Sequence, residues 1–101
     1  MSHCFVYLMA MTLPDGQGPI KVGIAQNPRR RWQSISGYSP FPVRLVNYWR
    51  FDDRDTARFI ETQLHAELGE TALRHEWFAM NHREAHGIIL ARMGDGVLSA
   101  A

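Results

Sequence analysis

The chain has 101 residues, a net charge of +1, and 46% hydrophobic and 21% charged residues. This length fits one domain with its own core, and the small net charge excludes a generic polycation. Any binding of nucleic acid must therefore come from a local basic patch. Cys4 is the single cysteine, which excludes an internal disulfide. No signal peptide is recognisable and no apolar run reaches transmembrane length, so we expect a cytoplasmic protein without membrane contact.

Two apolar segments near the start of the chain predict an antiparallel hairpin. Residues 4–11, CFVYLMAM, are rich in β-branched and aromatic side chains, and residues 20–25, IKVGIA, follow the turn-rich sequence LPDGQGP. Side chains alternate along a strand, so if the aliphatic residues of both strands face one core, Tyr7 and Lys21 lie together on the opposite face. The pair is then either a half-buried tyrosine beside a surface lysine or part of a functional site.

A helix is predicted after this hairpin. Asn27 is a favourable N-cap, Pro28 suits the first helical position, and Gly37 is the expected end. With Trp32 turned inward, Arg31 lies nearest the buried edge and is the best candidate for a fixed contact with phosphate. The two preceding arginines are either phosphate-steering groups or plain solvated surface. The three consecutive arginines are Arg29, Arg30 and Arg31.

A third strand and a second helix follow. Residues 43–51, VRLVNYWRF, favour a strand. Asp53 or Asp55 can cap the next helix, which we expect to run to Gly69. A stripe at three- and four-residue spacing predicts its buried face. The stripe consists of Ala57, Ile60, Leu64 and Leu68.

Glu61 and His65 lie four residues apart and therefore stack on one side of this helix, at the edge of its buried face. Two interpretations are open for the pair. It is an ordinary helical pair at the solvent edge, or a carboxylate at a cleft rim that holds a hard divalent cation beside an imidazole. For His65 alone, a partly buried ring bonded to a backbone carbonyl is an equal alternative.

The end of the chain completes a small α+β (α/β) fold. Residues 76–80, EWFAM, form a short extended segment, and Asn81 with Glu84 predicts the start of a last helix. We predict a single domain over residues 1–95 with the order β-β-α-β-α-(β)-α and a three-stranded, mostly antiparallel sheet flanked by helices. Residues 96–101 are expected to form a flexible tail.

Several of these positions resemble the motifs of the GIY-YIG nuclease superfamily. The segments FVY at 5–7 and KVG at 21–23 resemble its first and second motifs. Arg31 falls ten residues after Lys21, like the helix arginine that follows the second motif. Glu61, in a helix after the third strand, matches the metal-binding glutamate.

A phage-associated branch of that superfamily, often labelled a DNA-binding domain, is the most similar. His65 and the EWF segment at 76–78 resemble its LH and EWF signatures, and the resemblance covers residues 4–80. The first motif lacks its leading glycine. Lys21 stands where most family nucleases have tyrosine, and Asn81 is a poor match for a late asparagine of repair-type relatives.

This resemblance implies a DNA endonuclease that cleaves phosphodiester bonds with one Mg²⁺ or Mn²⁺ ion. It implies Glu61 as the metal ligand, Arg31 as a phosphate clamp, and Tyr7 as the group that orients or deprotonates water. Free tyrosine has a pKa of about 10, and we expect Lys21 and Arg31 to lower the pKa of Tyr7. His65 would hydrogen-bond a bound water or phosphate. The expected contacts with double-stranded or branched DNA are Lys21, Arg29, Arg30 and Arg31.

Three other functions remain open. A non-catalytic DNA-binding module on the same fold would reduce Glu61 to a structural ion pair. His82 and His86 have the spacing of a zinc peptidase motif, but Arg83 stands where that motif needs glutamate. A homodimer is the third alternative, although core packing accounts for most of the aromatic residues that would form its surface. These are Trp49, Trp77 and Phe78, together with the last helix.

Overall fold

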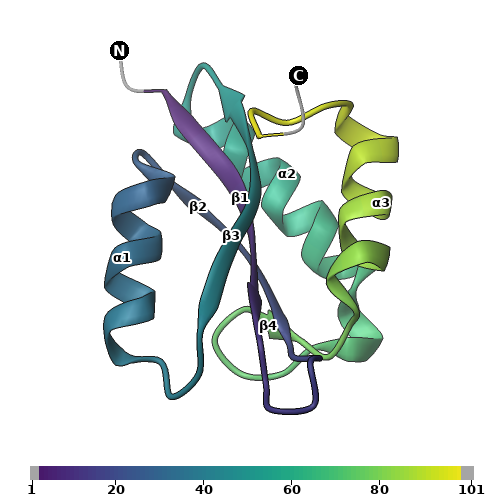
Figure 1. Cartoon of the computed structure of the whole chain (residues 1–101). Helices are drawn as coiled ribbons and strands as arrows, with labels where there is room; N and C mark the ends of the chain where they lie inside the picture. The colour runs from purple at the N-terminus through teal and green to yellow at the C-terminus, as the bar shows by residue number, and fades with distance from the viewer. Residues whose placement is uncertain (1–2, 99–101) are drawn as a thin grey trace.

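Four strands form one antiparallel sheet in the computed structural model, which describes residues 3–98 (Figure 1). The central strand β1 (Cys4–Met11) pairs with β2 (Ile20–Ala25) on one side and with β3 (Val43–Phe51) on the other. β4 (Trp77–Phe78) lies on the outer edge of β2, which gives the order β3-β1-β2-β4. The predicted α+β class is confirmed. The sheet has four strands instead of three because the short extended segment after α2 pairs with two residues of β2.

Three helices and a short 3-10 turn complete the chain. They are α1 (Pro28–Tyr38), α2 (Arg54–Glu67), the turn η1 (Gly69–Thr71) and α3 (His82–Met93). Each helix begins at a side-chain cap. The side chains of Asn27, Asp53 and Asn81 accept backbone N–H groups at 3.1, 2.7 and 2.8 Å, respectively. The predicted helix starts are confirmed, and Asp53 is the cap of α2.

Helix α1 ends one residue later than predicted. Gly37 stays inside the helix, and Ser39 leaves it with φ −82° and ψ 139°. Ser39 precedes Pro40, and a residue before proline is driven out of the helical region by the proline ring. The proline therefore ends α1, and Gly37 does not.

Helices cover both faces of the sheet. In Figure 1, α1 lies on one side of the strands, and α2 and α3 lie on the other. The core toward α2 and α3 contains the aliphatic residues of β1 and β2, packed against Leu64 and Ile89. The core under α1 contains Tyr7, Met9 and Ile35. The alternation predicted for the hairpin is confirmed, and each fully buried aliphatic side chain contributes roughly 1.5–3 kcal/mol to folding.

The chain beyond α3 runs back along β3. Val97 donates its backbone N–H to the Tyr48 carbonyl at 2.7 Å, and Leu98 donates to Asn47 Oδ1 at 2.9 Å. We expected residues 96–101 to form a flexible tail. The first three of these residues are held against β3, and the last three lie outside the described part of the chain.

The surfaces available to partners are limited by this packing. Within residues 3–98, none of the helices has the length and apolar character that a bilayer crossing requires. Trp49 and Phe78 are 4% and 3% exposed and belong to the core, while Trp77 is half-buried against the second cluster. Two of the three aromatic residues considered for a dimer surface are therefore core residues, and dimerisation stays a prediction.

Candidate functional site at the outer edge of strand β2

Tyr7 and Gly23 face each other across the β1–β2 pair, and Tyr7 is 1% exposed. The phenol lies over the glycine so closely that a Cβ atom at position 23 would sit 2.4 Å from Tyr7 Oη. Arg31 of α1 interacts with the same phenol through a hydrogen bond and through its charge. The structure thus brings Tyr7 and Arg31 together, and it explains why a glycine must face this tyrosine.

The pKa of Tyr7 is raised above 10.0, not lowered. Burial of the phenol is the largest cause, and the nearby carboxylates of Glu76 and Glu61 also raise the pKa. Arg31 lowers it but does not overcome the burial, and Lys21 is not among the causes. Of the two cations expected to lower the pKa of Tyr7, Arg31 does so, but the net shift is upward because desolvation of the buried phenol outweighs it. At neutral pH Tyr7 is a protonated hydrogen-bonding group.

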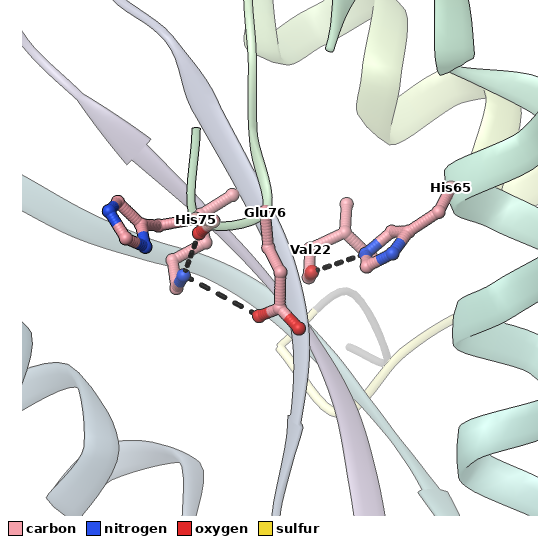
Figure 2. A network of polar contacts seen from close by, with 5 residues as sticks. Val22, His65, His75 and Glu76 are labelled. Carbon is pink, nitrogen blue, oxygen red and sulfur yellow. Dashed lines mark hydrogen bonds and ion pairs between the residues drawn. The ribbon is translucent and has the colours of Figure 1, made fainter. Parts of the chain in front are cut away.

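Lys21 is buried, with 6% exposure, and its ammonium group is already engaged. Nζ donates to the His75 carbonyl at 2.5 Å and lies 3.5 Å from Glu76 Oε2, the two partners labelled in Figure 2. It also sits 5.6 Å from the centre of the Trp77 ring. Burial lowers the pKa of Lys21, and the attraction of Glu76 opposes that shift. In this state Lys21 is tied to the β4 segment.

Glu61 lies on α2 and is 8% exposed. Its pKa is raised, first because the carboxyl group is buried and next because Glu76 is close, while His65 and Arg58 act in the opposite direction. Among residues 3–98 no salt bridge is formed by this carboxyl group. Its hydrogen-bonded neighbour is a second carboxyl group, that of Glu76. Glu61 is therefore a buried acid without a cationic partner in contact.

His65 lies one helical turn beyond Glu61, and its ring is fixed by two contacts. Nε2 donates to the Val22 carbonyl at 2.8 Å, because a carbonyl oxygen only accepts. The ring also packs against Phe78 with centroids 5.2 Å apart. Of the two interpretations of His65, a ring bonded to a backbone carbonyl describes this structure.

Glu76 is the residue that the sequence treatment missed. One carboxylate oxygen of Glu76, one of Glu61 and a ring nitrogen of His65 all lie within 4.8 Å of one another. Glu76 and the preceding His75 have φ angles of 68° and 59°, in the left-handed region. Such a conformation costs roughly 1–3 kcal/mol at a non-glycine residue and often marks functional sites. Glu76 is the first residue of the EWF segment, which is the signal in the sequence for this position.

The outer edge of β2 joins residues that come from opposite faces of the sheet. Val22 donates its N–H to the Glu76 carbonyl at 3.3 Å. Its own carbonyl accepts from the His65 ring, as Figure 2 shows. β4 pairs with Ile20 and Lys21 only, which leaves the backbone groups of Val22 to be bonded by His65 of α2 and by Glu76. The charge of Glu61 is felt by Tyr7 across it.

The remaining charged candidates lie apart from this cluster. Arg29 and Arg30 are exposed on α1, and neither forms a salt bridge within the described residues. His82 contacts Arg44 at 3.2 Å, and His86 contacts the Asn47 amide at 3.0 Å. Within residues 3–98, neither histidine belongs to a group of three potential metal ligands.

The fold and this cluster define a small α+β domain with a polar site at one edge of its sheet. The site contains acidic and basic side chains. The chain belongs to the T5orf172 domain family, whose family model matches residues 4–92. This is a phage-associated family often linked to endonuclease-like proteins. No curated protein and no solved structure matches the chain.

Proposed function

We propose that the protein is a divalent-metal-dependent endonuclease that hydrolyses DNA phosphodiester bonds in the manner of GIY-YIG nucleases. The observation that supports the proposal is the interaction of Arg31 with Tyr7 over Gly23 on the α1 face of the sheet, while the charge of Glu61, on α2, raises the pKa of the same phenol. Membership of a family linked to endonuclease-like proteins supports the same conclusion.

Each residue has a role that its surroundings suit. Arg31 is exposed and positively charged, and its planar guanidinium group can bind two phosphate oxygens. Tyr7 stays protonated, so it positions a water or phosphate oxygen by hydrogen bonding and does not act as a resting base. Arg29 and Arg30 extend the basic surface along α1 for contacts with the DNA backbone.

The acidic part of the site fits a cation. Glu61 is buried without a cationic partner in contact, which is costly unless a positive charge approaches. A divalent ion held by Glu61, Mg²⁺ or Mn²⁺, would stabilise charge on the phosphate and acidify a bound water. Glu61 supplies oxygen ligation of the kind both ions accept.

A non-catalytic DNA-binding module is the second candidate. It is favoured by the ion pair between Lys21 and Glu76 and by the raised pKa of Tyr7. In that case the arginines of α1 supply the phosphate contacts, and Glu61 and Glu76 serve to hold the β4 segment in place.

Nicking of supercoiled plasmid DNA by the purified protein separates the two candidates. With Mg²⁺ or Mn²⁺ we expect nicked product from the wild type and a loss of at least about 100-fold for Glu61→Gln, on the scale of a lost electrostatic catalyst. Glu70→Gln is the matched control, because Glu70 is an exposed carboxylate of η1 outside the cluster. DNA binding that weakens steeply with salt and is not accompanied by nicking would identify the binding module.

A further inference from the structure

Three potential metal ligands from two segments of the chain lie together near the outer edge of β2. Glu61 and His65 come from α2, and Glu76 comes from the loop that leads into β4. Their ligand atoms lie within 4.8 Å of one another. Glu76 lies fifteen positions after Glu61, so its presence here depends on the fold and not on a helical spacing.

The carboxyl groups of Glu61 and Glu76 face each other, and Lys21 is the cation that acts on both. Glu61 is more than nine-tenths buried, and its carboxyl group contacts that of Glu76. The hydrogen bond between them requires a proton on one of the two groups, because two ionised carboxylates at such a distance repel each other and burial strengthens the repulsion. A divalent ion between them would turn this repulsion into ligation.

His65 keeps one ring nitrogen for a ligand. Its Nε2–H bond to the Val22 carbonyl fixes the plane of the ring, and in the neutral ring the other nitrogen, Nδ1, carries the lone pair. A backbone carbonyl that holds one ring nitrogen is a common arrangement around a ligating histidine. The packing of the ring on Phe78 restricts it further.

Lys21 supplies the positive charge beside Glu76. Its ammonium group lies 3.5 Å from Glu76 Oε2 and is also bound by the His75 carbonyl (Figure 2). A lysine ammonium group and a divalent ion compete for the same carboxylate oxygens. Binding of an ion at Glu76 would therefore weaken the ion pair between Lys21 and Glu76.

We propose that Glu61, His65 and Glu76 form a binding site for one divalent first-row transition ion, and that Lys21 is the internal cation this ion displaces from Glu76. This inference depends on the proposed function for one point, the expectation that a divalent cation binds at Glu61. Two carboxylates and one imidazole favour Mn²⁺ over Mg²⁺, which prefers oxygen ligands and retained water. The ammonium group of Lys21, released from Glu76, becomes available to a phosphate.

Titration of the DNA-free protein with Mn²⁺, followed by the electron paramagnetic resonance signal of the free ion, tests the site without any DNA cleavage. We expect one bound ion in the wild type and a loss of affinity of about 10-fold or more in Glu76→Gln. His65→Gln lowers the affinity for Mn²⁺ more than the affinity for competing Mg²⁺. Lys21→Met, which fills the same space without the charge, binds Mn²⁺ several-fold more tightly.

Glu70→Gln serves again as the control and keeps the affinity of the wild type. If Glu76→Gln binds Mn²⁺ as tightly as the wild type, Glu76 is not a ligand. If Lys21→Met binds no more tightly, Lys21 does not compete with the ion. Should Glu76→Gln fail to fold, Glu76→Asn replaces it, because asparagine also removes the charge and tolerates the left-handed backbone at this position. An unchanged affinity in that variant overturns the site equally.

The outcomes for the site and for catalysis are separable. Mn²⁺ binding that depends on Glu76, without nicking of plasmid DNA, keeps the cation site and rejects the endonuclease. Nicking that depends on Glu61, with both binding and nicking unchanged in Glu76→Gln, keeps the endonuclease and rejects the three-residue site.

Discussion

At the scale of single residues, the contact between Tyr7 and Gly23 fixes the position of the phenol. The two residues are directly opposite in the hairpin, and Tyr7 Oη and Cζ would lie 2.4 and 2.6 Å from a Cβ atom at position 23. Such distances are far inside ordinary contact, so any side chain at position 23 must push the buried tyrosine ring away. The glycine is therefore required by packing and not by its backbone conformation.

Gly23→Ala is accordingly expected to destabilise the protein by about 1–3 kcal/mol, the usual range for overpacking a buried site. The measurement is the free energy of unfolding in urea. Tyr7→Phe in the Gly23→Ala background restores part of the loss, because it removes Oη but leaves Cζ in place.

Gly37→Ala is the control for this prediction. Nothing lies within 4 Å of a Cβ atom at position 37, and the residue is inside α1. Alanine there is expected to be neutral or to stabilise by up to about 1 kcal/mol. Equal stability of the Gly23→Ala and Gly37→Ala variants would contradict the packing argument.

At the scale of elements, α1 matters because it carries Arg31 to the phenol of Tyr7. The helix begins at Asn27, whose side chain accepts the N–H of Arg30 at 3.1 Å. It has no acidic residue in its first turn and no basic residue in its last. The helix is therefore held by its cap, by the packing of Ile35, and by the bond from Trp32 Nε1 to the Val43 carbonyl at 2.7 Å.

Asn27→Ala is expected to cost about 1 kcal/mol, the typical value for a lost N-cap. Asn27→Asp restores the cap and adds a favourable charge at the helix N-terminus. Circular dichroism during urea unfolding gives the stability of each variant. Gln26→Ala, an exposed neighbour without a capping role, serves as the control, and a cost equal to that of Asn27→Ala would contradict the capping assignment.

The elements and the strand faces follow from local patterns. The caps at Asn27, Asp53 and Asn81 and the alternation around Tyr7 depend on neighbouring residues only, so the sequence was enough to predict them. The end of α1 differs from the predicted one because Pro40 excludes Ser39 from the helix, whereas Gly37 is accommodated inside it.

The site was less predictable, because it is made by long-range contacts. Glu76 reaches Glu61 through two left-handed residues and the pairing of β4 with β2, none of which has a local signature. The pKa of Tyr7 depends on burial under α1, which motif spacing does not contain. Proximity of Tyr7 and Arg31 was foreseeable from the family resemblance, but the direction of the pKa shift was not.

At the scale of the whole molecule, Asn47 connects β3, α3 and the segment after α3. It is 0% exposed, and its Oδ1 accepts from the N–H groups of Tyr48 and Leu98 at 2.8 and 2.9 Å. Its Nδ2 group therefore donates to His86 Nε2, at 3.0 Å. This bond requires an unprotonated Nε2 on His86.

The stability of the protein should consequently fall in mild acid through His86. Its pKa is lowered from 6.5, first by burial and next by the charge of Arg44. A histidine with a lowered pKa contributes stability above its unfolded pKa, and this stability is lost as the pH falls through the folded pKa. Between pH 7.5 and the folded pKa the neutral ring keeps its bond to Asn47, and below it the bond is lost.

Denaturant unfolding of the wild type and of His86→Gln, compared at pH 7.5 and pH 5, tests this expectation. Glutamine offers an acceptor to Asn47 but does not titrate, so the difference in unfolding free energy between the two proteins should change with pH in favour of the variant. The raised pKa of Glu61 makes its contribution to stability fall as the pH rises, and this contribution is the same in both proteins and cancels in the difference. A difference that stays constant between the two pH values would show that protonation of His86 does not weaken the contacts of Asn47 with α3 and with the segment after α3.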